Sequence, residues 1–252
     1  MIFLLFILGA CFGSFYFVIG KRLPQGLNAV NNRSKCDHCG HTLAWYDLVP
    51  ILSYVILLGK CRYCHKKISF LNPLIEIVMG ISFAFAYGYY GVSYEMFMFI
   101  IVSSLMMIIF ISDFSYYIIL DSPLVVSVIA TVVLKLVYFG FREMLASLLS
   151  GLCLFLAMLL VKFIGDKIFK RESLGGGDIK FAFVMGLILN FRLGLCALIL
   201  STFLALPYSV GALMLKKNNE VPYGPFLASS LFLVYVFITK FSNLLDLIFI
   251  SL

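Results

Sequence analysis

The stretch LGGGDIK at residues 174–180 places three consecutive glycines and the carboxylate of Asp178 directly before a long apolar segment. Glycine destabilises a helix interior and is usually found where the backbone takes unusual dihedral angles or where another chain comes close. Similar glycine runs also occur in plain linker turns that only end a helix. A chemical role for Asp178 therefore depends on what the rest of the chain brings near it.

The composition is that of a polytopic membrane protein. Of the 252 residues, 63% are hydrophobic and 12% are charged, whereas the charged fraction of soluble domains is about 25%. Because a membrane-spanning helix needs about 20 apolar residues, we predict an all-α protein with about eight transmembrane helices in a lipid bilayer. The net charge of +7 fits basic cytoplasmic loops, so we expect no nucleic acid as partner.

The N-terminal region combines an apolar segment with a basic block. Residues 1–20 have no basic segment before them and no small-residue cleavage site after them, so we expect a retained first transmembrane helix. Residues 21–72 contain eight of the nineteen basic residues. By the positive-inside rule this block is cytoplasmic and the N-terminus lies outside. The eight residues are Lys21, Arg22, Arg33, Lys35, Lys60, Arg62, Lys66 and Lys67.

Residues 73–252 are predicted to form the transmembrane core. Short polar turns separate its apolar runs, and the alternation of sides places Asp113 and Asp178 at the same, cytoplasmic face. The span at residues 181–189 is short for a full crossing, unless Ile179 and Lys180 belong to it. The seven predicted spans of this core cover residues 73–90, 96–112, 122–139, 144–164, 181–189, 193–215 and 227 onward.

Two Cys-x-x-Cys pairs, Cys36 with Cys39 and Cys61 with Cys64, lie in the basic block. Their spacing is typical of four thiolates around a tetrahedral structural zinc. A loop of about 50 residues has little apolar core, so zinc would stabilise a small zinc-ribbon-like insertion. Two disulfides are the alternative, which a reducing cytoplasm disfavours. Four cysteines suffice as ligands, so the neighbouring histidines are expected to be surface residues: His38, His41 and His65.

Three aspartates, Asp113, Asp121 and Asp178, lie at the edges of predicted spans. Ionisable residues at such positions are costly and are functional candidates. Two carboxylates close together in a poorly hydrated site share a proton and can activate water against a peptide carbonyl. Asp113 is the candidate partner of Asp178, whereas Asp121 precedes Ser122-Pro123 and is interpreted as a helix cap. Lys180 either holds a neighbouring carboxylate in its charged form or marks the cytoplasmic border.

Six segments in order resemble the type IV prepilin peptidases, the membrane aspartyl proteases with a Gly-x-Gly-Asp motif. The segments are GSF at 13–15 with RLP at 22–24; the two cysteine pairs with VPILSY at 49–54; NPLIE at 72–76; Asp113 with Asp121; GGGDIK at 175–180; and VPYGPF at 221–226. The chain departs from the family pattern at Leu120, where a proline is common, and at Asn72, where a tyrosine is frequent. Both departures concern local loop shape.

The resemblance implies that Asp113 and Asp178 are the catalytic pair of an aspartyl endopeptidase in the bacterial cytoplasmic membrane. The substrates would be type IV prepilin or pseudopilin precursors, cut after a glycine at the cytoplasmic face. The resemblance also implies N-methylation of the new N-terminus with S-adenosylmethionine, although the sequence has no Gly-rich turn of the nucleotide-binding kind.

Three alternative functions remain at this point. The first is a peptidase without methyltransferase activity. The second is a secondary transporter, which the lack of an internal repeat and the interfacial depth of the aspartates disfavour. A zinc-stapled scaffold without chemistry would leave the aspartates unexplained.

Overall fold

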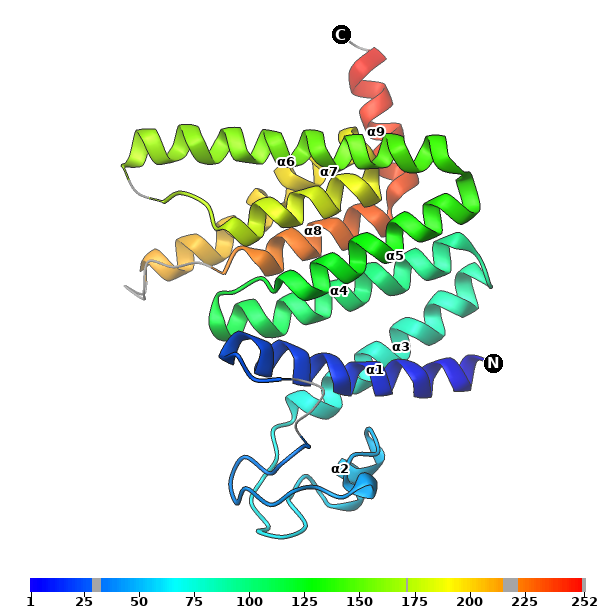
Figure 1. Ribbon diagram of the computed structural model, residues 1–252, viewed down its shortest axis with the longest axis vertical. Helices are drawn as coiled ribbons and strands as arrows, with labels where there is room; N and C mark the ends of the chain where they lie inside the picture. The colour runs from blue at the N-terminus through cyan, green and yellow to red at the C-terminus, as the bar shows by residue number, and fades with distance from the viewer. Residues whose placement is uncertain (29–32, 171, 215–221, 251–252) are drawn as a thin grey trace. The chain divides into compact units, whose positions relative to one another are not determined.

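A computed structural model describes residues 1–28, 33–170, 172–214 and 222–250, and this part of the chain is all-helical apart from two isolated β-bridges. The predicted all-α class is confirmed. Figure 1 shows the helices, which form two compact units, Met1–Ile111 and Ser112–Leu252. The helices are α1 (Ile2–Arg22), α2 (Leu52–Ile56), α3 (Leu71–Tyr90), α4 (Tyr94–Tyr116), α5 (Asp121–Phe139), α6 (Phe141–Phe169), α7 (Gly176–Met214), α8 (Gly224–Val236) and α9 (Ile238–Ile250), with the 3-10 helices η1 (Leu23–Gln25) and η2 (Trp45–Asp47).

Six helices within the described residues are long and apolar enough to cross a membrane. They are α1 with η1, α3, α4, α5, α6 and α7, and α8 is a shorter apolar helix. The chain is therefore a multi-pass membrane protein. By length alone these helices give six spans where the sequence predicts about eight.

One of the two missing spans is accounted for by α8, which is shorter than the others, and the other by α7. Asn190 has φ 70° and ψ 171°, which no α-helix contains, so α7 consists of two helices joined at this residue. The sequence predicts a turn at residues 190–192, and the structure reduces this turn to a single non-helical residue. The first of the two helices begins at Gly176, so Ile179 and Lys180 belong to it.

In the first unit, α1 packs on α3 through small residues. A Cβ atom on Gly13 would lie 2.9 Å from the Ile75 carbonyl oxygen, and Gly9, one turn earlier, is equally close to α3. This is the glycine spacing by which membrane helices approach closely, since lipid supplies no hydrophobic force between them. The Tyr16 hydroxyl also donates to Ser104 Oγ of α4 at 2.9 Å.

In the second unit, α6 and α7 cross where two glycines meet. A Cβ on Gly186 would lie 2.8 Å from Gly151 Cα, so neither helix tolerates a side chain there. Close to this crossing, the buried Lys135 of α5 donates from Nζ to Ser147 Oγ at 2.8 Å and to the Leu187 carbonyl at 2.7 Å. Carbonyls at a helix end lack intrahelical donors. Lys135 therefore satisfies one of the last carbonyls before the break at Asn190.

We predict that Lys135→Met destabilises the protein by about 1–3 kcal/mol, because the buried Ser147 hydroxyl and Leu187 carbonyl lose a charged donor. Thermal unfolding in detergent measures the change. Lys167→Met removes an exposed lysine of α6 and is the control, expected to stay within about 0.5 kcal/mol. Equal effects of the two substitutions would contradict the role of Lys135.

Candidate active site and cysteine cluster

Asp178 lies in the first turn of α7, where the backbone of Gly175 hydrogen-bonds its carboxylate. This is the arrangement in which an acidic side chain at the third helical position accepts from the N-cap N–H. The three glycines before it do not have left-handed φ values, so unusual dihedral angles do not explain them. A Cβ on Gly177 would lie 2.8 Å from Ile119 Cβ, whereas one on Gly176 would point into open space. Close approach of the segment after α4 explains Gly177.

Asp113 lies in the last turns of α4 and is 4% exposed. Its Oδ2 accepts a hydrogen bond of 2.9 Å from the backbone N–H of Gly224, the first residue of α8. The first N–H groups of a helix have no intrahelical partner and carry partial positive charge. The start of α8 therefore provides a favourable partner for a buried carboxylate.

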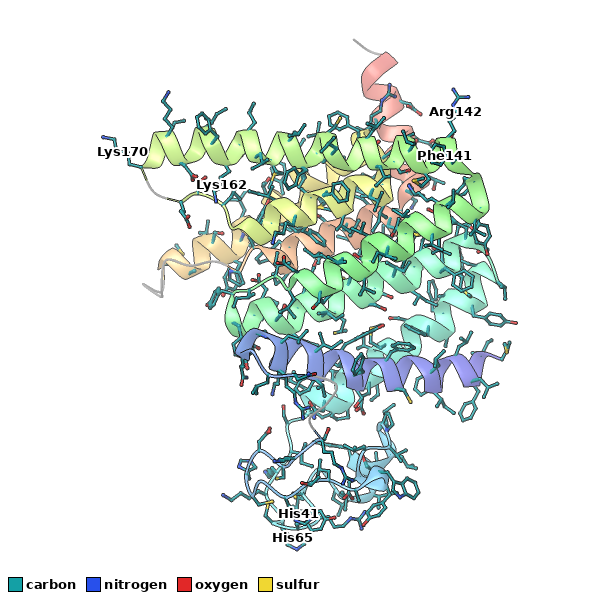
Figure 2. The ribbon with its side chains drawn as sticks, viewed as in Figure 1. His41, His65, Phe141, Arg142, Lys162 and Lys170 are labelled. Carbon is teal, nitrogen blue, oxygen red and sulfur yellow. The ribbon has the colours of Figure 1, made fainter. Side chains whose placement is uncertain are left out.

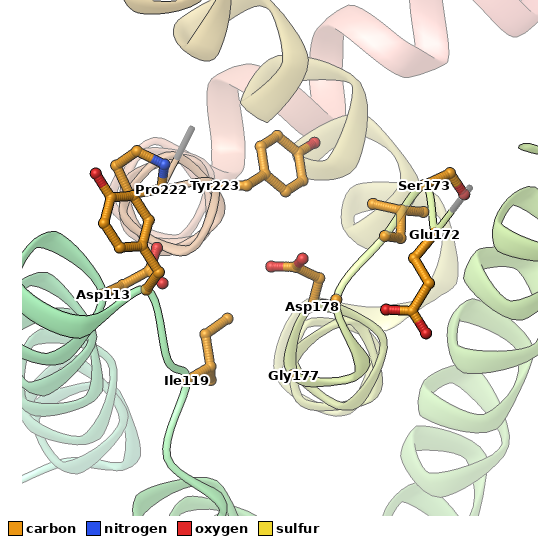
Figure 3. Close-up of a pocket in the computed structure, with 11 residues that line it drawn as sticks. Asp113, Ile119, Glu172, Ser173, Gly177, Asp178, Pro222 and Tyr223 are labelled. Carbon is orange, nitrogen blue, oxygen red and sulfur yellow. The ribbon is translucent and has the colours of Figure 1, made fainter. Parts of the chain in front are cut away.

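The structure brings the two aspartates to one pocket of about 520 Å³ within the second unit. In Figure 3 the carboxylates of Asp113 and Asp178 point toward one another across the pocket, and Glu172 points away from them. No role was predicted from the sequence for the other residues of the pocket, although the stretches quoted there include Leu174, Gly175, Gly177, Pro222 and Tyr223. The lining residues also include Tyr117, Ile119, Ser173, Leu174, Gly175 and Gly177.

Tyr223 forms a neutral, hydrogen-bonding wall of this pocket. Its hydroxyl lies 2.7 Å from Ser201 Oγ of α7. Burial raises the pKa of Tyr223, and the nearby charge of Asp178 raises it further, although the hydrogen bond with Ser201 acts in the opposite direction. The phenol therefore keeps its proton. Because the Ser201 hydroxyl donates to the Leu198 carbonyl at 2.7 Å, Tyr223 is the donor in its hydrogen bond with Ser201.

The interpretation of Asp121 as a helix cap is wrong. The N-cap of α5 is Leu120, without a side-chain cap, and Asp121 is the first helical residue. Its two carboxylate oxygens instead accept from Lys180 Nζ at 2.7 and 2.8 Å. Of the two roles considered for Lys180, the structure shows the pairing with a neighbouring carboxylate. The pair is exposed, so it contributes only about 0–1 kcal/mol to stability.

The four cysteines of the two Cys-x-x-Cys pairs form one cluster. Their Sγ atoms all lie within 4.8 Å of one another, and those of Cys36 and Cys64 are 3.8 Å apart. Four sulfurs at about 2.3 Å from a tetrahedral zinc would be about 3.8 Å from one another. All seven cysteines of the chain are free, so the disulfide alternative is not observed. The donor set and its spacing fit a metal ion.

The two cysteine turns have the same backbone hydrogen bonds. Cys36 N–H donates to the His41 carbonyl and Gly40 N–H to the Cys36 carbonyl, and the same pattern recurs between Cys61 and Lys66 and between His65 and Cys61. Backbone hydrogen bonds from Cys39 and His38 lower the pKa of the Cys36 thiol to about 6. The two turns thus bring their sulfur atoms together, and the lowered pKa of Cys36 favours its thiolate form, which is the form that binds metals.

The histidines beside the cluster are exposed, as predicted. His38, His41 and His65 have exposed side chains, and the His41 ring contacts that of Tyr63 at a tilt of 33° with centroids 3.7 Å apart. His41 and His65 lie at the outer edge of the loop in Figure 2.

Comparison with known proteins assigns the chain to a family. Residues 7–90 match the Bacterial Peptidase A24 N-terminal domain and residues 100–210 match the Type IV leader peptidase family. The protein from Bacillus subtilis named prepilin leader peptidase/N-methyltransferase is 31% identical over 240 residues, which are 94% of each chain. The chain belongs to the type IV prepilin peptidase (Peptidase A24) family, which confirms the resemblance of its motifs.

Two further relatives carry the same name. The one from Myxococcus xanthus is 34% identical over 223 residues, which are 88% of this chain and 64% of the relative. The one from Vibrio cholerae is 28% identical over 241 residues, 88% of this chain and 91% of the relative. No solved structure matches the chain.

We predict that Gly177→Ala destabilises the protein by about 1–3 kcal/mol, because the new methyl group would overlap Ile119. Gly176→Ala is the matched control one residue away. Its methyl group meets open space, and alanine in a helix is favoured over glycine by up to about 1 kcal/mol. Thermal unfolding of both variants checks the difference, and a Gly177→Ala variant as stable as Gly176→Ala would contradict the close contact.

Proposed function

We propose that this chain is a membrane aspartyl endopeptidase that cleaves the leader of type IV prepilin or pseudopilin precursors and N-methylates the new N-terminus. The relatives' names describe both activities. The carboxylates of Asp113 and Asp178 face one another across a single pocket. This observation supports the assignment of peptidase activity to these two residues.

In the proposed reaction the two carboxylates share one proton. The ionised carboxylate takes a proton from a water molecule while that water attacks the carbonyl carbon of the scissile bond. The protonated carboxyl group donates to the carbonyl oxygen. When the tetrahedral intermediate collapses, the proton taken from water passes to the leaving amine. The proton on the former carbonyl oxygen returns to the carboxylate that donated it, so no metal or covalent intermediate is required.

The pocket has room for a peptide backbone beside the aspartates. Gly175 lines it next to Asp178, and the lack of a side chain there lets a substrate chain approach the carboxylate. Tyr223 lines the same pocket and donates its hydroxyl proton to Ser201, so its oxygen can accept a hydrogen bond from a substrate N–H.

The proposed topology has eight crossings in the bacterial cytoplasmic membrane, with the N-terminus outside. It counts the two helices of α7 separately and includes α8. In Figure 2 Arg142 lies at one end of α6, and Lys162 and Lys170 lie toward the other, which supports a cytoplasmic C-terminal end of α6. Within this topology residues 1–20 are the first helix, residues 21–72 a cytoplasmic insertion and residues 73–252 the protease core.

The cytoplasmic insertion is proposed to hold one structural zinc ion through Cys36, Cys39, Cys61 and Cys64. The geometry of the four sulfurs supports this choice of ligands. A zinc ion would cross-link the two turns of an insertion that has little apolar core. With four protein ligands it would have no open coordination position for catalysis.

Methyl transfer, with S-adenosylmethionine as the methyl donor, is proposed on the basis of family membership alone. We assign no residues of this chain to it. The alternative is a peptidase that lacks this second activity.

We predict that Asp113→Asn and Asp178→Asn each lower leader cleavage by on the order of 10²–10⁴-fold, because each removes a group that transfers a proton. The purified protein is incubated with a prepilin, with and without S-adenosylmethionine, and the products are analysed by mass spectrometry. Glu172→Gln, which alters the third carboxylate of the pocket, is the control and should cleave normally. Normal cleavage by either aspartate variant would refute the assignment, and a processed N-terminus without a methyl group would favour the peptidase-only alternative.

We predict about one zinc ion per chain in the purified protein and its loss in Cys61→Ser, since a structural site needs all four ligands. Elemental analysis measures the ratio of zinc to protein. Cys196→Ser, outside the cluster, should retain the metal. A metal-free wild-type protein with normal activity would exclude the zinc proposal.

A further inference from the structure

An apolar surface is exposed on the insertion between α1 and α3, and the chemistry described above does not use it. Within residues 45–58, η2, α2 and their flanks expose six large apolar side chains in addition to Tyr46, and of these six Trp45 is 78% and Leu58 is 83% exposed. We call these six residues the apolar surface. They are Trp45, Leu48, Leu52, Val55, Ile56 and Leu58.

The apolar surface has a defined orientation because the other side of α2 is packed. Leu52, Val55 and Ile56 have the spacing of one helix face. Tyr54, between them in sequence, instead packs against Gly59, where a Cβ would lie 2.9 Å from its ring, and it contacts Phe70 with ring centroids 6.4 Å apart. The short helix α2 therefore directs its apolar face outward and its tyrosine inward.

A hydrogen bond ties the start of α2 to α3. The backbone N–H of Ile51, directly before α2, donates to Glu76 Oε2 at 2.7 Å. Glu76 is 7% exposed and lies in the second turn of α3, one of the six helices long and apolar enough to cross a membrane. The apolar surface thus starts within hydrogen-bond distance of a helix that enters the bilayer, and the bilayer is the nearest large apolar phase.

The charge of the same insertion complements an anionic membrane surface. Residues 33–70 contain six basic and two acidic residues, and Lys60, Lys66 and Lys67 follow the apolar surface with exposed side chains. Lysines near a membrane are attracted to anionic phospholipids by about 1 kcal/mol each. Tryptophan is also enriched at the level of the headgroups.

We propose that the apolar surface inserts into the headgroup region of the bilayer that α3 enters, with Lys60, Lys66 and Lys67 bound to anionic phospholipid. The insertion then lies flat on the membrane at this face. This docking does not depend on the chemistry at Asp113 and Asp178.

The chain contains a single tryptophan, so its fluorescence reports on Trp45 alone. The full-length protein is reconstituted in vesicles of phosphatidylcholine and phosphatidylglycerol whose acyl chains carry bromine at a shallow position. We expect brominated lipid to quench Trp45 about twofold or more, as for a tryptophan at the interface, and aqueous acrylamide to quench it weakly. Strong acrylamide quenching without lipid quenching would overturn the proposal, as would protection from both quenchers, which indicates a protein partner.

Substitutions separate the apolar and the charged contributions. Leu52→Ser combined with Val55→Ser and Ile56→Ser should decrease lipid quenching and increase acrylamide quenching. Val92→Ser is the matched control, because Val92 is a 70% exposed apolar residue between α3 and α4 of the same unit and should leave both unchanged. If the triple variant behaves like the control, the apolar surface does not dock.

The charged contribution is tested by replacing Lys60, Lys66 and Lys67 with glutamine. We expect the wild type to be quenched less by lipid in pure phosphatidylcholine vesicles than in vesicles that contain phosphatidylglycerol. The variant should show this weaker quenching even when phosphatidylglycerol is present. Equal quenching of the wild type in the two vesicles would overturn the role of the three lysines. Retention of the wild-type reactivity of the four clustered cysteines toward a thiol reagent shows that each variant has folded.

Discussion

The hydrogen bond from the Gly224 backbone to the Asp113 carboxylate is the contact on which the pocket depends. It joins the end of α4 to the start of α8 across 111 residues of sequence. A buried carboxylate without a partner is costly, and the first N–H groups of a helix have no intrahelical acceptor, so each group satisfies the other. Since Tyr223 directly precedes Gly224 and lines the same pocket, the contact that holds Asp113 also places Tyr223 opposite Asp178.

Glycine contacts hold segments close together by the same physical means within each of the two units. Gly13 against α3, Gly186 against Gly151 and Gly177 against Ile119 all leave no room for a Cβ atom. In a membrane, helices associate through close packing and polar contacts, because lipid is as apolar as the side chains it surrounds. Lys135 adds a polar contact of this kind by bonding Ser147 and the Leu187 carbonyl.

The sequence predicted features that depend on local pattern and missed those that depend on distant partners. Apolar run lengths and cysteine spacing are local, and they gave the all-helical membrane class, the clustering of four cysteines and the family. The pairing of Asp121 with Lys180 joins residues 59 apart in sequence. It was not predicted, because the residues next to Asp121 indicate a helix cap. Glu172 and Tyr223 line the pocket only because of how the chain folds, and no sequence spacing predicts that they do. The catalytic roles of Asp113 and Asp178 stay a prediction.

The break at Asn190 makes the first helix of α7 a short one. Residues 176–189 rise about 21 Å at 1.5 Å per residue, whereas the hydrocarbon layer of a bilayer is about 30 Å thick. A helix shorter than the layer is accommodated by local thinning of the bilayer or by polar groups reaching toward the interface. Local thinning would bring water closer to Asp178, at the start of this helix, and water is the second substrate of any hydrolase.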